Sequence, residues 1–85
     1  MAWKWGFTKK SEDQFKKLDN QIKKRIEEKL DFWMQSGMPL EFAENLTNYE
    51  LGSYRFRVGD YRITFDVEEE TIVVLAVGHR REIYK

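Results

Sequence analysis

The beginning of the chain alternates apolar and polar side chains. Trp3, Trp5 and Phe7 share one parity within residues 2–7, which read AWKWGF. Strict alternation over a short stretch is typical of a β-strand that buries one of its two faces. The pattern therefore predicts a half-buried strand at this end of the chain.

Residues that favour a helix start follow the predicted strand. Either Thr8 or Ser11 can act as an N-cap, and Gln14 stands three residues after Ser11, as in a capping box. Phe15 and Leu18 then supply an apolar side. These features predict a short first helix.

A second helix is indicated by apolar residues that recur at spacings of four, four and three, with charged residues on the rest of the circumference. These apolar residues are Ile22, Ile26, Leu30 and Trp33. Asp19 or Asn20 can cap the start of this helix, and Gly37 and Pro39 predict its end.

Residues 39–52 show no clean period, and we predict a connecting loop held to the core by its apolar side chains, Leu40, Phe42 and Leu46. After this loop the period becomes two. SYRFRV and YRITFDV flank Gly59-Asp60, a two-residue hairpin turn signal led by glycine. The last apolar run, TIVVLAV, is nearly continuous, which predicts a strand in the middle of the sheet.

The predicted order is strand, helix, helix and then three strands. This order is typical of an α+β fold in which a helix pair packs on an antiparallel sheet. A chain of 85 residues encloses one hydrophobic core, so residues 1–85 are expected to form a single domain.

Composition narrows the function classes. The chain has no cysteine, which excludes a disulfide framework, a thiolate metal site and a cysteine nucleophile, and which fits a reducing compartment. No segment approaches the roughly 20 apolar residues of a membrane span, and no signal-peptide pattern is present. We therefore expect a cytoplasmic protein. Fifteen basic and fifteen acidic residues argue against binding nucleic acid by bulk attraction.

Arginine is concentrated in the predicted hairpin. Counting outward from the turn places Arg57 directly across from Arg62, and Arg55 across from Thr64. Like charges in opposed positions destabilise a strand pair, so this arrangement indicates that an anion lies between them. The alternative is that each arginine reaches a carboxylate of the chain, such as Asp66 or Glu50, or extends into solvent.

The end of the chain adds further cations and an aromatic ring. Gly78 is followed by His79, Arg80 and Arg81, and Tyr84 stands next to the last residue. Guanidinium groups bind phosphate in bidentate fashion, and an aromatic ring at their edge can stack on an unpaired base. We therefore predict a site for single-stranded RNA formed by Arg55, Arg57, Arg81 and Tyr84.

Two separated motifs, YRFRVGDYRI and VGHRREIY, resemble the RelE branch of the RelE/ParE toxin superfamily. The resemblance covers almost the whole chain and includes the FTKKSEDQFKKLD segment. It implies a RelE-like toxin that enters the A site of a 70S-type ribosome, cleaves messenger RNA and is inactivated by a cognate antitoxin. It further implies that the 2′-hydroxyl of the RNA attacks the adjacent phosphate and that neither a metal nor another cofactor takes part.

The resemblance also implies roles for individual residues. Arg55 and Arg57 match the two basic positions of the family's second strand, and Arg62 matches the arginine of its third. Arg80 matches the basic residue after the last strand, and Tyr84 matches the terminal tyrosine. The implied catalytic group is thus Arg55, Arg57, Arg62, Arg80 and Tyr84.

The proton acceptor is left open, because better-known members carry lysine where Arg55 and Arg57 stand, and arginine effectively cannot lose its proton. Histidine is the side-chain type that exchanges protons near neutral pH, so His79 is a further catalytic candidate. A surface or turn position is its alternative reading. A mechanism based on orientation and charge stabilisation needs no such base.

Two other functions remain open on the sequence. A ParE-like protein shares the fold but inhibits DNA gyrase, and a catalytically inert member would only bind its antitoxin. The complete arginine and tyrosine set favours the ribonuclease, because a gyrase inhibitor does not need it. A glycine-rich phosphate loop, a metal-ligand cluster and the second histidine of a two-histidine ribonuclease are missing from the sequence.

Overall fold

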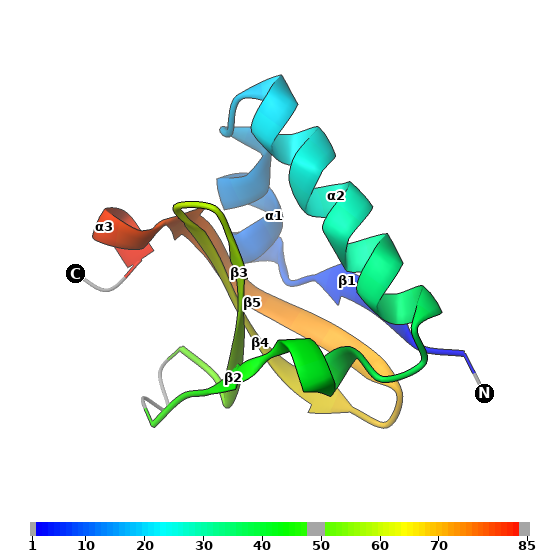
Figure 1. Cartoon of the computed structure of the whole chain (residues 1–85). Helices are drawn as coiled ribbons and strands as arrows, with labels where there is room; N and C mark the ends of the chain where they lie inside the picture. The colour runs from blue at the N-terminus through cyan, green and yellow to red at the C-terminus, as the bar shows by residue number, and fades with distance from the viewer. Residues whose placement is uncertain (1, 48–50, 84–85) are drawn as a thin grey trace.

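A computed structural model describes residues 2–47 and 51–83 of the chain (Figure 1). Its elements in chain order are β1 (Lys4–Phe7), α1 (Lys9–Lys16), α2 (Asn20–Gln35), the 3₁₀ helix η1 (Pro39–Phe42), β2 (Glu44–Asn45), β3 (Tyr54–Val58), β4 (Tyr61–Glu68), β5 (Thr71–His79) and α3 (Arg80–Ile83). The predicted α+β fold is confirmed, with the strands joined in one sheet.

The five strands are arranged in the order β1-β5-β4-β3-β2. The apolar strand β5 lies inside the sheet, as its sequence predicts. The sheet differs from the predicted antiparallel one in a single pairing, because β1 runs parallel to β5 while the other neighbours are antiparallel. The direction of β1 relative to a strand more than sixty residues away depends on the tertiary path of the chain, which local periodicity does not record.

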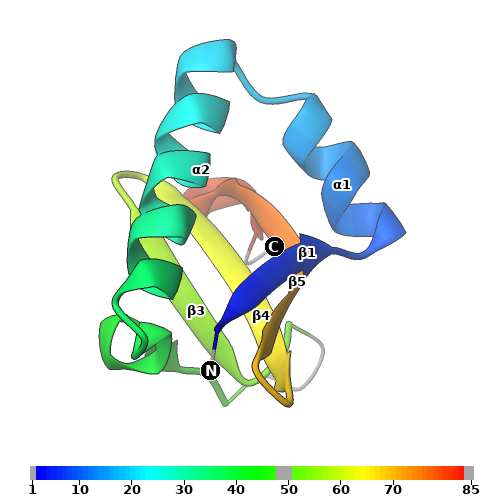
Figure 2. The ribbon, with the colours of Figure 1, turned by 90° about the vertical axis from the view of Figure 1, so that its right-hand side faces the viewer.

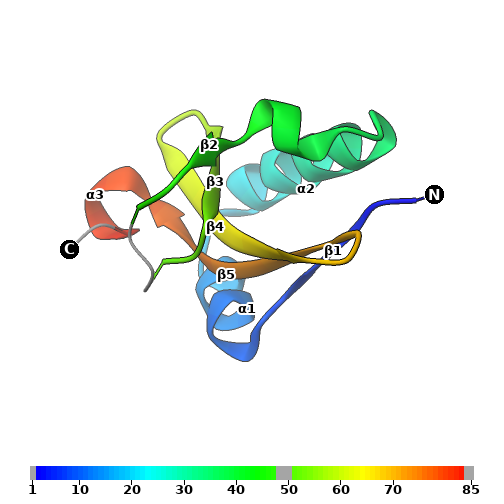
Figure 3. The ribbon, with the colours of Figure 1, turned by 90° about the horizontal axis from the view of Figure 1, so that it is seen from below.

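The core lies between α2 and one face of the sheet (Figures 2 and 3). Aromatic stacking joins the two layers, since the ring centroids of Trp33 and Phe56 are 4.2 Å apart and those of Phe56 and Phe65 are 4.4 Å apart. Trp3, Trp5 and Phe7 pack against this core, which confirms the alternation predicted for β1.

Helix α1 continues the contacts of β5 beyond the point where β1 ends. The hydroxyl of Ser11 donates a hydrogen bond to the carbonyl of Val74 (2.7 Å), and the amide of Val77 donates to Gln14 Oε1 (3.0 Å). Thr8 is the N-cap of α1. The predicted capping-box role of Gln14 is therefore wrong, because Gln14 instead satisfies a buried backbone amide of β5 that has no strand partner on that side.

The predicted hairpin register is confirmed at every pair, from Val58 opposite Tyr61 to Tyr54 opposite Phe65. Gly59 has φ +60°, a conformation that glycine adopts at little steric cost, so the turn led by glycine is also confirmed. The register of β4 against β5 shifts between Thr64 and Phe65, which leaves Leu75 as an extra residue in β5.

Within the predicted loop, residues 39–47 contain regular structure, namely η1 and the two-residue strand β2. Neither element has a local signal, since β2 exists only through its pairing with β3. Leu40 packs against the core as expected, and Phe42, although 45% exposed, stacks on the core residue Trp33 with the ring centroids 6.1 Å apart. Helix α3 is likewise absent from the prediction.

Candidate functional site

The three hairpin arginines lie on the face of the sheet opposite the core. Arg55, Arg57 and Arg62 alternate along β3 and β4 with core residues such as Phe56 and Ile63, so their side chains leave the opposite side. We call this surface, formed by Arg55, Arg57 and Arg62, the arginine face. Figure 1 shows α3 on the side of the sheet away from α2, next to the β3–β4 turn.

A carboxylate at the start of β2 holds two of these arginines. Arg55 Nε donates to Glu44 Oε1 at 3.0 Å, and Arg57 Nε lies 3.8 Å from the same oxygen. The hydrogen bond from Arg55 holds the pKa of the Glu44 carboxyl below its usual value; partial desolvation opposes this effect, and the charges of Arg55, Arg57 and Arg62 add to it. Glu44 is therefore ionised at neutral pH.

Glu44 was missed by the sequence analysis, because only the pairing of β2 with β3 brings it opposite Arg55. The carboxylate considered from the sequence, Asp66, accepts a hydrogen bond from the amide of Ser53 (2.8 Å) instead. Glu50 lies outside the described residues. Among the described residues, a carboxylate of the chain thus pairs with Arg55 and Arg57, and that carboxylate is Glu44.

Arg62 is the buried cation of the site, with 6% of its surface exposed. Its Nη1 donates to the carbonyls of Gly59 (2.9 Å) and Tyr61 (3.0 Å). Within residues 2–47 and 51–83, no carboxylate lies at ion-pair distance from its guanidinium. A buried charge without a counter-charge is costly, so this position favours the approach of an anion.

Space for a ligand exists beside Arg62. Gly78 of β5 lies directly opposite Arg62 in the sheet, and a Cβ added to Gly78 would meet no atom within 4 Å. Because glycine has no side chain, the surface of the sheet is open next to the buried guanidinium of Arg62.

Arg80 is anchored at the same turn as Arg62. The Arg80 amide donates to the carbonyl of Asp60 (2.8 Å), and its Nε lies 3.8 Å from Asp60 Oδ1. Because Arg62 binds the carbonyl of Gly59 and Arg80 binds Asp60, the two-residue turn positions both guanidinium groups. Arg81, the next residue, is exposed.

His79 is separated from the arginine face. It pairs with Tyr61, whose ring packs against the core, and the two ring centroids are 5.5 Å apart. Its Nδ1 accepts a hydrogen bond from the amide of Arg81 (3.1 Å). Residues directly opposite in a sheet share a face, so His79 points to the side away from Arg57 and Arg62. Tyr84, predicted as part of the site, lies outside the described residues.

Comparison with known proteins places this fold in a class. The family model described as the ParE toxin of type II toxin-antitoxin system, parDE, matches residues 6–84. A chain of the RelB-RelE antitoxin-toxin complex from Methanococcus jannaschii is 30% identical over 92% of this chain and 93% of that one, with a TM-score of 0.71. No individually curated protein matches the sequence.

Two further solved structures have the same fold at lower identity. The RelBE2 toxin-antitoxin complex from Mycobacterium tuberculosis contains a chain with a TM-score of 0.79 and 24% identity, over 94% of this chain and 100% of that one. An arginine double mutant of E. coli RelE in the free state gives a TM-score of 0.73 and 20% identity, over 99% of this chain and 92% of that one.

These matches define the toxin component of a type II toxin-antitoxin system. The chain belongs to the RelE/ParE toxin superfamily. Two general features of the structure accompany this assignment. In the described part of the chain, no helix combines the length and apolar character needed to cross a membrane, and no three histidine or carboxylate side chains gather at a possible metal site.

Proposed function

We propose that this toxin is a ribosome-dependent endoribonuclease of the RelE type. The observation that carries the proposal is the buried Arg62, directly across from Arg57 and without a carboxylate partner among the described residues. A sheet selected only for stability would not place two arginines there. A phosphate group between them removes the repulsion.

The chemistry that suits this geometry is attack by the 2′-hydroxyl of the RNA on the adjacent phosphate. The new bond forms between the 2′-oxygen and phosphorus, and the bond to the 5′-oxygen breaks, which yields a cyclic phosphate and a 5′-hydroxyl end. Arg57 and Arg62 bind the phosphate, and Arg80 adds a third guanidinium at the turn. Together they stabilise the extra negative charge of the pentavalent transition state.

Glu44 acts in this proposal as a positioning residue. Its ionised carboxylate holds Arg55 and Arg57 in fixed orientations, and this favours one phosphate geometry over others. The placement of His79 beside Tyr61, away from the arginine face, supports a mechanism that relies on orientation and charge rather than on this histidine. Arg81 and Tyr84 remain proposed RNA contacts, and neither a metal nor a cofactor is assigned.

The proposed partners are a cognate antitoxin, messenger RNA and a 70S-type ribosome, in the cytoplasm. The solved relatives support the antitoxin, since two of them are complexes of RelB with RelE or of the RelBE2 pair. A ParE-like inhibitor of DNA gyrase is the second candidate, and the match to the ParE family model favours it. A catalytically inert antitoxin-binding member is the third.

Induced expression followed by mapping of messenger RNA 5′ ends tests the proposal. New ends inside translated codons, absent when Arg57→Ala is expressed at the same level, are expected. If growth stops without such ends and purified gyrase loses supercoiling activity, the protein is a gyrase inhibitor. If growth continues, the protein is a catalytically inert member that only binds its antitoxin.

A further inference from the structure

His79 is a titratable side chain that the proposed mechanism does not use. It is half-buried and lies at the end of β5, directly before α3. Its Nδ1 accepts a hydrogen bond from the amide of Arg81, two residues further along the chain, at 3.1 Å. Because Nδ1 accepts this bond, the proton of the neutral imidazole lies on Nε2. The imidazole is therefore a hydrogen-bond acceptor for the backbone of α3.

The position of His79 is that of a helix N-cap. The first amides of a helix have no partner within the helix, and the side chain directly before the helix commonly accepts a hydrogen bond from one of them. Side chains with a short oxygen acceptor usually do this, and Thr8 caps α1 in this way. His79 makes the equivalent bond with a ring nitrogen.

The start of α3 is held at two points. The amide of Arg80 donates to the carbonyl of Asp60 in the β3–β4 turn (2.8 Å). The amide of Arg81 donates to the imidazole, which is itself held against Tyr61 in an edge-to-face contact with the ring centroids 5.5 Å apart. Tyr61 packs against the core. His79 thus connects the backbone of α3 to the hydrophobic core.

The two arginines of α3 depend on this backbone for their direction. Arg80 and Arg81 are both exposed, and the ion pair of Arg80 with Asp60 is long, with 3.8 Å between Nε and Oδ1. An exposed ion pair of this kind contributes little to holding a side chain in place. Helix α3 has only four residues, and so short a helix does not persist without contacts to the rest of the protein. The contacts at its start therefore set the direction of both guanidiniums.

We propose that His79 is a positioning residue, whose imidazole caps α3 and thereby orients Arg80 and Arg81 toward the bound RNA. The imidazole exchanges no proton with the substrate. It acts through the backbone of α3, which accounts for a histidine that points to the side of the sheet away from Arg62. The effect on cleavage rests on the proposed ribonuclease function, whereas the capping bond does not.

Two substitutions separate the acceptor of His79 from its ring. His79→Asn keeps an acceptor that can cap a helix but loses the ring, whereas His79→Phe keeps a ring against Tyr61 but has no acceptor. On programmed ribosomes, the asparagine variant should cleave messenger RNA with the parental kcat/KM. The phenylalanine variant should lose about fivefold in kcat/KM, the effect of one lost cap.

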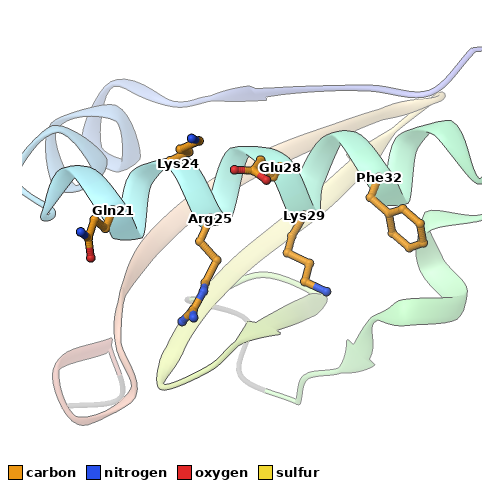
Figure 4. A pocket seen from close by; sticks show the side chains of 6 residues that line it. All are labelled: Gln21, Lys24, Arg25, Glu28, Lys29 and Phe32. Carbon is orange, nitrogen blue, oxygen red and sulfur yellow. The ribbon is translucent and has the colours of Figure 1, made fainter.

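A substitution on another surface controls for unspecific effects. Gln21→Ala changes a side chain on the outer side of α2, in a shallow hollow shown in Figure 4, whereas α3 lies on the side of the sheet away from α2 (Figure 1). This control variant should cleave like the parent.

Nuclear magnetic resonance tests the capping bond without the ribosome. In the isotope-labelled parent protein, a scalar coupling across the hydrogen bond should connect the Arg81 amide with Nδ1 of His79. The Arg81 amide should exchange with solvent more slowly in the parent and in His79→Asn than in His79→Phe. Absence of the coupling, together with equal exchange in both variants, would overturn the proposal.

The cleavage assay distinguishes the remaining explanations. An asparagine variant that keeps the protected amide but cleaves as poorly as the phenylalanine variant would show that His79 is a general acid or base, and the proposal would be wrong. Parental cleavage by the phenylalanine variant would also overturn it, because ring packing alone would then suffice. A parent protein that shows the coupling and the exchange difference but cleaves no messenger RNA would refute the ribonuclease and support the capping role.

Discussion

Arg57 of β3 lies directly across from Arg62 of β4, on the face of the sheet that points away from the hydrophobic core. The two side chains differ in their surroundings. Arg57 is 57% exposed and close to Glu44, whereas Arg62 is 6% exposed and bound to two turn carbonyls. A ligand can therefore approach Arg57 from solvent and meet Arg62 as a fixed, preorganised cation.

Substitution of the arginines should lower the rate of messenger RNA cleavage on ribosomes. Arg57→Ala and Arg80→Ala are each expected to reduce kcat by about a hundredfold to a thousandfold, because each removes one donor to the transition-state charge. Arg62→Lys should act similarly, since lysine keeps the charge but not the planar fork of donors. Arg25→Ala on α2 is the control and should cleave normally. Full toxicity of the Arg57 and Arg80 variants at equal expression would contradict the assignment.

Removal of the Glu44 charge should affect KM and kcat in different ways. Glu44→Gln removes the negative charge next to Arg57, so RNA should bind more tightly and KM should fall. The Arg57 guanidinium then loses the carboxylate that holds its orientation, so kcat should fall as well. Steady-state cleavage on programmed ribosomes separates the two constants. A variant in which only the folded fraction changes, with KM and kcat per folded molecule intact, would show that Glu44 is merely structural.

The pairing of Glu44 should also make stability depend on pH. Because its pKa is lowered on folding from the usual 4.5, the pairing stabilises the native state above that pH and ceases to do so as the pH falls through the lowered pKa. The difference in unfolding free energy between the parent and Glu44→Gln should therefore be present at neutral pH and vanish in acid. Urea denaturation across this range measures it. Glu41→Gln serves as the matched exposed control, and an equal pH-dependent difference there would refute the role of the arginine pairing.

A single 2′-deoxy nucleotide at the scissile position should abolish cleavage. The proposed attacking group is the 2′-hydroxyl, and a chelator that leaves the ribosome intact should have no effect. The assay uses a programmed ribosome complex with matched ribose and deoxyribose messages. Cleavage of the deoxy message would indicate hydrolysis by activated water. Loss of cleavage of the ribose message when the chelator is added would indicate a metal-assisted reaction.

Thr64→Val should stabilise the protein. Thr64 is fully buried on the side of the arginine face, opposite Arg55, and its hydroxyl has no hydrogen-bond partner among the described residues. Replacement by a methyl group of similar size removes an unsatisfied polar group, which is worth about 1 kcal/mol or more. Denaturant unfolding gives the change in free energy, and Thr64→Ser is the control that keeps the hydroxyl. A destabilised valine variant would mean that the hydroxyl has a partner in solution.

Local patterns of the sequence determined the hairpin and the main helix. Gly59 leads a two-residue turn, and from that turn the period of two alone places Arg57 opposite Arg62. The spacing of Ile26, Leu30 and Trp33 likewise determines which side of α2 is buried. Both features depend on residues close together in the chain, where backbone geometry leaves few alternatives.

Only the tertiary structure decided which groups meet the arginines. Glu44 reaches Arg55 because a two-residue strand pairs across the intervening loop, and such a short strand has no period of its own. The parallel direction of β1 and the bonding of Gln14 to β5 depend in the same way on distant segments. His79 turned away from the site because the register of β5 against β4 pairs it with Tyr61. Long-range register is set by packing of the whole sheet, which local periodicity cannot specify.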